Sequence, residues 1–198
     1  VAHTGGVRLH LEDGRSLVDG IASWWTACHG YNHPHIVEAI QAQAARMPHV
    51  MFGGLAHEGA YRLAARLAQR LPGQLNHAFF AESGSVAVEI AMKMAIQFHI
   101  NKGISGRTRF LSFRGGYHGD TLATMTVCDP EEGMHALFRG VMPSQVIADL
   151  PVDDASEAAL DALLALDARY VAAILVEPLV QGAGGMLFHD AQTLRRLR

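Results

Sequence analysis

The sequence predicts an α/β fold with a largely parallel sheet, because segments with the pattern of strands alternate with segments of helical periodicity. The clearest strand covers residues 170–176 (YVAAILV), which are apolar throughout, as expected of a central parallel strand covered on both faces. The other expected strands of this sheet are residues 78–81, 109–113 and 145–150. The helices expected between them cover residues 86–98, 122–127 and 157–168.

Length and composition suit one globular domain or slightly more. The chain has 198 residues, of which 49% are hydrophobic and 18% charged, so it can bury a substantial core. A formal net charge of -3 argues against binding to nucleic acid or to an anionic membrane. No apolar run is long enough to span a bilayer, and the two cysteines match no metal or redox motif. A cytoplasmic location is therefore expected. Since both ends interrupt a pattern, we expect part of a longer protein.

Residues 1–30 are expected to form a segment of a small flanking subdomain, and residues 31–198 the first part of the main domain. Residues 7–18 alternate apolar and polar side chains around Asp13 and Gly14, which is typical of a β-hairpin. Trp24 and Trp25 follow in an irregular stretch. Adjacent side chains on a loop rarely both enter one core, so at least one is expected to face a cleft or a partner. The alternative is that both are ordinary core or interface aromatics.

Two amphipathic helices are expected next, over residues 34–47 and 57–71, with Pro34 at the start of the first. In the second helix, the residues expected on the buried face are Leu63, Leu67 and Leu71. Those expected on the solvent-exposed face are Arg62, Arg66 and Arg70. Several of the chain's 12 histidines surround the first helix, which raises the alternative of a metal-binding protein. No pair of them has a carboxylate or cysteine partner at a known ligand spacing, so surface and capping roles are expected and no metal site is assigned.

The chain is organised around residues 77–98, where a short apolar run, a Ser/Gly turn and a helical pattern follow one another directly. The free N–H groups of such a turn and the positive end of the helix dipole are directed at one place. Small residues at this point, Gly84 and Ser85, allow an anion to come close. The residues expected along the buried face of the helix are Val86, Ile90, Met94 and Phe98. The segment predicts a phosphate site, unless its serines only cap the helix.

Two later strands end in turns of the same kind. Residues 109–113 lead into a glycine-rich turn that presents Tyr117 and Asp120, and residues 170–176 lead into Glu177 and a second glycine-rich loop. A buried strand that delivers a carboxylate at its tip is hard to explain by stability alone. In parallel sheets, ligands bind beyond the carboxyl ends of the strands. A phosphate cradle, a flat aromatic and two acids suit a phosphorylated, planar, ring-bearing cofactor better than a dinucleotide, for which no G-x-G-x-x-G opens a helix.

These motifs resemble those of the subgroup III, fold-type I aminotransferases, which use pyridoxal 5'-phosphate. The stretches shared broadly with that family are residues 83–89 (SGSVAVE), 116–121 (GYHGDT) and 177–178 (EP). More specific stretches resemble the biotin-pathway branch of the family: residues 23–25 (SWW), 29–34 (HGYNHP), 49–54 (HVMFGG), 128–130 (CDP) and 181–186 (QGAGGM). The resemblance covers essentially the whole chain. It implies the three-layer large domain of that family, truncated, with part of its small N-terminal β subdomain, in a homodimer.

The resemblance also implies an activity. An amino group would pass from S-adenosylmethionine to 8-amino-7-oxononanoate, giving 7,8-diaminononanoate. The implied cofactor-binding residues are Gly84, Ser85, Tyr117 and Glu177. The implied substrate-binding residues are Trp24, Trp25, Tyr117 and Asp120. Ala183 stands where relatives acting on ornithine or γ-aminobutyrate carry a glutamate, which argues against their substrates.

One requirement of the chemistry is not met within the sequence. The reaction needs a lysine that forms a Schiff base with the cofactor and an acid facing the pyridine nitrogen. The only lysines are Lys93, in the helix after the phosphate turn, and Lys102, in a polar loop. No residue is therefore assigned as catalytic, and the chain alone is expected to be inactive. The alternatives are a subgroup III transaminase with another amine substrate, and a non-catalytic homologue or fragment that keeps the fold.

Overall fold

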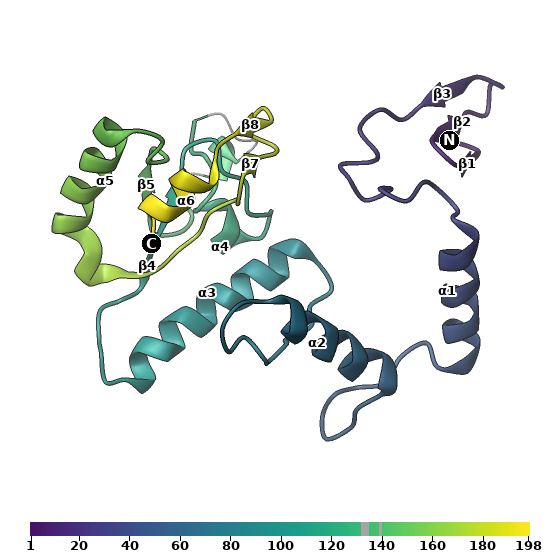
Figure 1. Ribbon diagram of the computed structural model, residues 1–198, viewed down its shortest axis with the longest axis horizontal. Helices are drawn as coiled ribbons and strands as arrows, with labels where there is room; N and C mark the ends of the chain where they lie inside the picture. Colours follow the sequence, from purple (N-terminus) through teal and green to yellow (C-terminus); the bar gives the residue numbers. More distant parts are fainter. Residues whose placement is uncertain (132–134, 139) are drawn as a thin grey trace. The chain divides into compact units, whose positions relative to one another are not determined.

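The computed structural model of the protein describes residues 1–131, 135–138 and 140–198. The chain forms two compact units, Val1–Ala78 and Phe79–Arg198 (Figure 1). The first unit carries the tryptophan pair and two of the helices, and the second carries the parallel sheet. This division lies at a different place from the domain boundary expected between residues 30 and 31, which stays a prediction.

The first unit begins with a small antiparallel sheet of β1 (His3–Gly5), β2 (Arg8–His10) and β3 (Ser16–Val18), in the order β1-β2-β3. Strands β2 and β3 pair with Arg8 opposite Val18, so the hairpin predicted over residues 7–18 is confirmed. Its turn is held by the Asp13 carboxylate, which accepts a hydrogen bond of 3.1 Å from the backbone N–H of Arg15. Gly14 has a φ of +86°, a conformation that glycine adopts without strain.

Two helices follow in this unit, α1 (Pro34–Arg46) and α2 (Glu58–Arg70), within a residue of their predicted bounds. The imidazole of His57 caps α2 by accepting a hydrogen bond of 3.3 Å from the N–H of Ala60. The leucine stripe predicted to be buried on α2 is exposed instead. A single amphipathic helix buries its apolar stripe only where another element packs on it, so periodicity alone does not determine burial.

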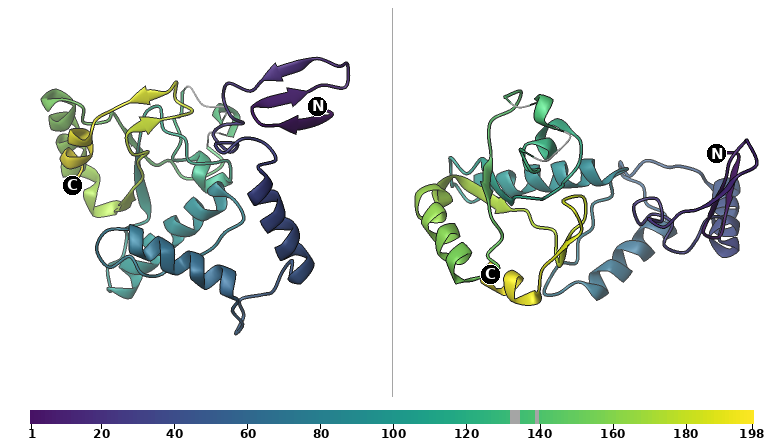
Figure 2. Two further views of the ribbon diagram at one scale, coloured as in Figure 1. Left: turned by 45° about the vertical axis from the view of Figure 1, so that its right-hand side comes forward. Right: turned by 90° about the horizontal axis from the view of Figure 1, so that it is seen from above.

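The second unit contains a parallel sheet of β4 (Arg109–Phe113), β5 (Val146–Ala148) and β6 (Val171–Ile174), in the order β5-β4-β6. Leu111 lies opposite Val146 on one side and Ile174 on the other, and both pairings are parallel. Between these strands run α3 (Gly84–Asn101), which precedes β4, and α5 (Asp154–Asp167), which connects β5 to β6. The predicted α/β class with a parallel sheet is therefore confirmed (Figure 2).

Shorter elements complete this unit. Their bounds are α4 (Leu122–Met125), η1 (Ala136–Phe138), η2 (Ala168–Tyr170), β7 (Val180–Gln181), β8 (Leu187–Phe188) and α6 (Ala191–Arg196). Strands β7 and β8 pair antiparallel and form a small ribbon after β6. Helix α5 begins earlier than residue 157, because Asp153 and Ser156 form a capping box at its N-terminus.

Helices cover both faces of the sheet. On one face, Leu111 and Phe113 of β4 pack with Leu160 of α5 in one apolar cluster. On the other face, Phe110 packs with Met92 of α3. Because side chains alternate along a strand, consecutive residues of β4 belong to different clusters, which gives three layers with β4 at the centre.

Two strand predictions are wrong. Residues 78–81 lead into α3 as an irregular segment, and Phe79 is exposed there. A strand needs a neighbouring strand to pair with, and the two edges of the sheet, β5 and β6, are not paired with this segment. Separately, β6 was expected to be central but lies at an edge of the sheet that the structure describes.

The buried face of α3 also differs from the prediction. The residues of α3 packed against the sheet are Val88, Met92, Ala95 and Ile96, whereas Met94 and Phe98 are exposed. Apolar residues surround most of this helix, so its periodicity does not single out one face. Within the described part of the chain, no helix combines the length and the apolar character needed to cross a membrane.

Replacing Leu111 by alanine is expected to lower the free energy of unfolding by about 2–5 kcal/mol, because a buried leucine leaves a cavity that the surrounding core fills only in part. Leu111 is 0% exposed and touches both neighbouring strands of the sheet. Urea unfolding measures the loss. The control is Leu166→Ala on the exposed side of α5, which should change the free energy by about 0.5 kcal/mol or less. Equal losses for the two variants would contradict this description of the core.

Candidate active site

The start of α3 has the geometry expected of an anion site. Ser83 is the N-cap, and its Oγ accepts a hydrogen bond of 3.2 Å from the N–H of Val86. The N–H groups of Gly84 and Ser85, in the first turn, have no acceptor among the residues that the structure describes. A Cβ placed on Gly84 would meet no atom within 4 Å, so the space in front of this turn is open. Ser83 therefore acts as a cap, and the two residues after it are free to bind an anion.

The second predicted turn is docked directly on the first. The N–H of Asp120 donates a hydrogen bond of 3.0 Å to Ser85 Oγ. Gly119, just before it, has a φ of +125°, and a Cβ there would lie 2.3 Å from Ser85 Oγ. Gly116 is similarly confined, because a Cβ would lie 2.7 Å from the carbonyl oxygen of Phe113. Glycine at 119 therefore lets the two turns approach each other, and glycine at 116 lets the second turn fold back tightly on the end of β4.

Tyr117 and Asp120 form the most polar pair of this site. The Tyr117 hydroxyl donates a hydrogen bond of 2.5 Å to Asp120 Oδ2. Burial, together with this hydrogen bond and the charge of Asp120, raises the pKa of Tyr117 to about 12. The same hydrogen bond is the main cause that holds the pKa of Asp120 below its ordinary value, and His135 adds to the effect. At neutral pH the pair is a neutral phenol donating to an ionised carboxylate.

Replacing Asp120 by asparagine is expected to lower the pKa of Tyr117 from about 12 toward, but not to, its ordinary value of 10, because burial is the larger cause and remains. Because the pKa of Tyr117 is raised in the folded state, its protonated hydroxyl contributes to the free energy of unfolding. That contribution is fully present below pH 10 and is lost as the pH rises through about 12. The measurement is an ultraviolet titration of phenolate, with Tyr117→Phe subtracted to isolate one of the four tyrosines. An unchanged Tyr117 pKa in Asp120→Asn would refute the hydrogen bond.

Glu177 joins the second turn to the third. Its Oε1 accepts a hydrogen bond of 2.9 Å from the N–H of Tyr117, and its Oε2 accepts one of 2.9 Å from the N–H of Gly182. The backbone carbonyl of Glu177 is 2.9 Å from His189 Nε2. A carboxylate that accepts from two backbone donors is fixed in orientation. The structure thus brings the three predicted turns together, with Glu177 as the link between two of them.

A close backbone approach supports the same junction. Gln181 Nε2 donates a hydrogen bond of 2.6 Å to the carbonyl oxygen of Arg114. A Cβ on Gly184 would lie 2.1 Å from the carbonyl oxygen of Gly115. Glycine at 184 therefore lets the third turn lie against the second without a gap.

Two residues of this site were not predicted from the sequence. Cys128 is buried and its Sγ accepts from the N–H of His118 at 3.1 Å, which fixes the backbone one residue after Tyr117. Burial raises the pKa of the Cys128 thiol and lowers the pKa of the His118 imidazole. His135 contacts Asp120 from the part of the chain between α4 and β5, where no site residue was predicted. Neither residue belongs to a periodic pattern, and although Cys128 lies in the stretch 128–130 that carries part of the resemblance, nothing in the sequence indicated these contacts.

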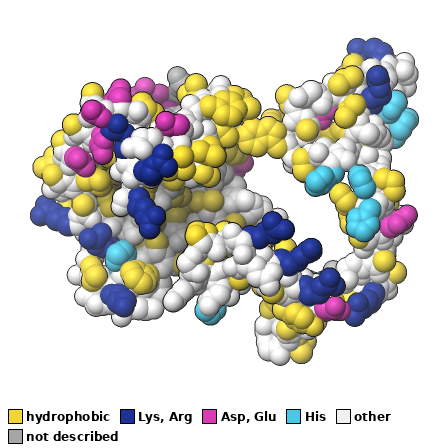
Figure 3. Space-filling view, in the orientation of Figure 1, with side chains coloured by type: hydrophobic (Ala, Val, Ile, Leu, Met, Phe, Trp, Pro, Cys, Tyr) yellow, Lys and Arg dark blue, Asp and Glu magenta, His cyan; other side chains and the backbone are white. Residues whose placement is uncertain are grey.

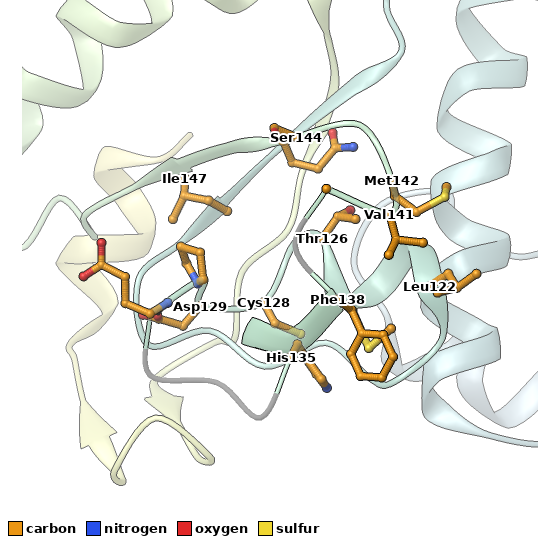
Figure 4. Close-up of a pocket in the computed structure, with 15 residues that line it drawn as sticks. Leu122, Thr126, Cys128, Asp129, His135, Phe138, Val141, Met142, Ser144 and Ile147 are labelled. Carbon is orange, nitrogen blue, oxygen red and sulfur yellow. Dashed lines mark hydrogen bonds between the residues drawn. The ribbon is translucent and has the colours of Figure 1, made fainter.

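Cys128 and His135 both line a pocket of about 340 Å³ (Figure 4). His135, which contacts Asp120, is part of its wall. The larger apolar side chains that line it are Leu122, Met125, Phe138, Val141, Met142 and Ile147. Polar and charged side chains, among them Asp129, Glu131 and Gln145, also line the pocket, so its wall is mixed in character.

Trp24 and Trp25 belong to the first unit and are held in an unusual turn. Four consecutive residues, from Ala22 to Trp25, have φ between +46° and +70°, which costs energy for residues other than glycine. The Asp19 carboxylate holds the turn by accepting hydrogen bonds of 2.8 Å from Ser23 N–H and 2.5 Å from the Tyr31 hydroxyl. Trp24 is 86% exposed, and Trp25 is exposed too. Neither enters a core of this unit, and their role toward a substrate stays a prediction.

Half of the 12 histidines are exposed, and those near α1 are visible on the surface in Figure 3. Among residues 1–131, 135–138 and 140–198, no three His, Cys, Asp or Glu side chains form a group that could hold a metal ion. The structure therefore adds nothing in favour of the metal-binding alternative in the part of the chain it describes.

The family model for aminotransferase class-III matches residues 1–198. The chain belongs to the class-III aminotransferases. The resemblance seen in the sequence motifs is thereby confirmed at the level of the family, and the three-layer fold matches solved transaminase structures.

Individual relatives of this class-III aminotransferase chain carry a common name. This chain is 48% identical over 195 residues to the adenosylmethionine-8-amino-7-oxononanoate aminotransferase of Corynebacterium glutamicum. The match covers 96% of this chain and 46% of that protein. This chain is 44% identical over 203 residues to the protein of the same name from Mycobacterium leprae, covering 100% of this chain and 47% of that protein. The chain thus spans about half the length of the curated relatives it matches.

Solved structures of transaminases also superpose on this chain. The adenosylmethionine-8-amino-7-oxononanoate aminotransferase from Methanocaldococcus jannaschii superposes with a TM-score of 0.91 at 30% identity, covering 98% of this chain and 44% of that one. An amine transaminase from an uncultivated Pseudomonas species, solved in its PLP-bound form, superposes with a TM-score of 0.85 at 33% identity. The match covers 100% of this chain and 48% of that one. The architecture is that of class-III aminotransferases over the whole described chain.

Proposed function

We propose that the full-length protein containing this chain is a pyridoxal-phosphate-dependent aminotransferase of biotin biosynthesis. It transfers an amino group from S-adenosylmethionine to 8-amino-7-oxononanoate and yields 7,8-diaminononanoate. The observation that carries this proposal is the 48% identity, over 96% of this chain, to a relative named for that reaction. Members with other substrates are the second candidate, favoured by the TM-score of 0.85 to an amine transaminase at 33% identity.

The residues at the start of α3 fit the phosphate of such a cofactor. Gly84 and Ser85 offer two N–H groups without acceptors among the described residues, at the positive end of an 18-residue helix. Tyr117 is 36% exposed, so its ring has a face available to lie against a flat, electron-poor ring. When bound, pyridoxal phosphate supplies the reactive carbonyl carbon and the electron-withdrawing ring that amino transfer requires. Glu177 would support this arrangement through the backbone of Tyr117, rather than by direct contact.

The Tyr117 and Asp120 pair suits a substrate with a positively charged amino group. The Asp120 side chain is 57% exposed and ionised at neutral pH, because its pKa lies below the ordinary value. It retains lone pairs for an ammonium group in addition to the Tyr117 hydroxyl. Tyr117 remains protonated well above neutral pH and can donate to a substrate oxygen. Both substrates named in the proposal carry an ammonium group, and 8-amino-7-oxononanoate also carries a ketone beside it.

The Schiff-base lysine of the proposed reaction is assigned outside these 198 residues. Lys93 lies in α3, about 13 Å along the helix axis from Gly84 at 1.5 Å per residue. Lys102 is the residue that caps the other end of the helix. Neither is near the open space in front of Gly84. The resemblance of the motifs further supports a homodimer and a cytoplasmic location, which light scattering and cellular fractionation of the full-length protein would test.

An assay with exchanged amino donors tests the proposal. Full-length protein, pyridoxal phosphate and 8-amino-7-oxononanoate are incubated with S-adenosylmethionine or with alternative amines, and 7,8-diaminononanoate is quantified by mass spectrometry. Product is expected with S-adenosylmethionine. Product only with another amine would favour the second candidate, and the absence of cofactor absorbance would favour a non-catalytic homologue. Lys93→Ala and Lys102→Ala serve as controls and should keep the activity.

A further inference from the structure

His135 completes a cluster around the proposed substrate-binding carboxylate. Its Nε2 lies 3.0 Å from Asp120 Oδ1, while the Tyr117 hydroxyl takes the other oxygen, Oδ2, at 2.5 Å. The backbone N–H of Asp120 is already bound to Ser85. The imidazole ring of His135 also stacks on the Tyr117 ring, with centroids 6.1 Å apart and an interplanar angle of 22°. Asp120 is thus held from three sides, and His135 touches both members of the pair.

The direction of the hydrogen bond follows from charge. An ionised carboxylate can only accept, so His135 Nε2 carries the proton and donates it to Asp120. The side chain of His135 is 10% exposed, whereas that of Asp120 is 57% exposed. Its other nitrogen, Nδ1, is buried and has no hydrogen-bond partner among the described residues. A buried polar atom without a partner costs stability, so packing alone does not explain a histidine at this position.

The placement of His135 matches a supporting role. Its largely buried ring contacts the exposed carboxylate of Asp120. It also forms part of the wall of the neighbouring pocket (Figure 4). An exposed aspartate otherwise samples several rotamers, and ordering it on binding costs entropy. A donor on each oxygen fixes the plane of the carboxylate before the substrate arrives, and leaves the remaining lone pairs directed outward.

We propose that His135 is a positioning residue for substrate recognition: through Asp120 and the Tyr117 ring, it fixes the carboxylate that receives the ammonium group of the amino acceptor. The inference rests on the proposed function, because that function assigns Asp120 to 8-amino-7-oxononanoate. It deepens that function by adding a residue that supports the substrate pair and stays clear of the open space at Gly84 and Ser85.

Two variants of the full-length protein separate the contributions of His135. His135→Phe keeps an aromatic ring against Tyr117 and removes the donor, whereas His135→Gln keeps an N–H donor and removes the ring. The dissociation constant of 8-amino-7-oxononanoate is measured by calorimetry, and that of pyridoxal phosphate by absorbance. His135→Phe should weaken binding of the acceptor by about tenfold or more, because the lost bond is to a charged group. His135→Gln should stay within about threefold of wild type in acceptor binding. In His135→Phe, which keeps a ring against Tyr117, cofactor affinity should change by less than about twofold.

A double variant tests whether His135 acts through Asp120. In the Asp120→Asn background, His135→Phe should change acceptor binding by less than about twofold, because effects within one network do not add. Full additivity, unchanged acceptor binding in His135→Phe alone, or an equal loss of cofactor affinity would each overturn the inference. Failure of the proposed function is recognised separately, since wild type itself would then not bind 8-amino-7-oxononanoate.

Discussion

Replacing Gly84 by valine is expected to weaken pyridoxal phosphate binding by about 100-fold or more, which is about 2.7 kcal/mol. The branched side chain would fill the open space in front of the first turn of α3, where the phosphate is proposed to bind. The same change should leave stability nearly unaltered, because a Cβ at this position meets no protein atom within 4 Å. Equilibrium titration of the full-length apoprotein with the cofactor, followed by absorbance, measures the loss.

Gly59 in α2 provides the matched control for this variant. It also lies in the first turn of a helix, and a Cβ there makes only an ordinary contact, 3.5 Å from the His57 ring. Gly59→Val should therefore keep the cofactor affinity of wild type. If Gly84→Val retained that affinity as well, the start of α3 would not be the phosphate site.

Replacing Gly119 by alanine is expected to separate the two turns of the site. The methyl group would lie 2.3 Å from Ser85 Oγ and 2.7 Å from Ser85 Cα, on a backbone with a φ of +125°. The second turn must move, which breaks the hydrogen bond from Asp120 to Ser85. We expect a loss of about 3 kcal/mol or more in the free energy of unfolding, from strain together with overpacking. Urea unfolding measures it, and binding of both cofactor and substrate should fall as well.

The Gly106→Ala variant measures the cost of backbone strain without a steric clash. Gly106 has a φ of +85°, but a Cβ there meets nothing within 4 Å. This variant should lose only about 1 kcal/mol, the usual cost of the conformation for a residue with a Cβ. A loss in Gly119→Ala no larger than that in Gly106→Ala would show that the two turns are not docked as described.

Much of the fold follows from local pattern. The hairpin around Gly14, the helices α1 to α3 and the parallel strands β4 to β6 all arise from periodicity and from turn residues that the sequence displays. The three turns of the site were predicted for the same reason, since each follows directly on an apolar run. The second and third turns meet because β4 and β6 are parallel and their carboxyl ends lie at a common edge of the sheet. The first turn follows no strand of the sheet and is joined to the second by the hydrogen bond from Asp120 to Ser85.

Other features depend on tertiary contacts that no local pattern encodes. The buried face of α3 is set by which neighbours pack on it, and a helix that is apolar nearly all round offers no preference. Residues 78–81 have the composition of a strand, but no described strand of the sheet pairs with them, so they stay irregular. His135 and Cys128 reach the site from an irregular stretch, so their partners, Asp120 and the backbone of His118, are visible only in the folded chain.

The most direct test of the proposed site is a crystal structure of the full-length protein with pyridoxal phosphate. The phosphate oxygens should lie within about 3.2 Å of the backbone nitrogens of Gly84 and Ser85. The Tyr117 ring should face the cofactor ring, with Asp120 still bound to the Tyr117 hydroxyl. A cofactor whose phosphate is bound elsewhere, with the first turn of α3 in contact with solvent alone, would contradict the assignment of this turn as the phosphate cradle.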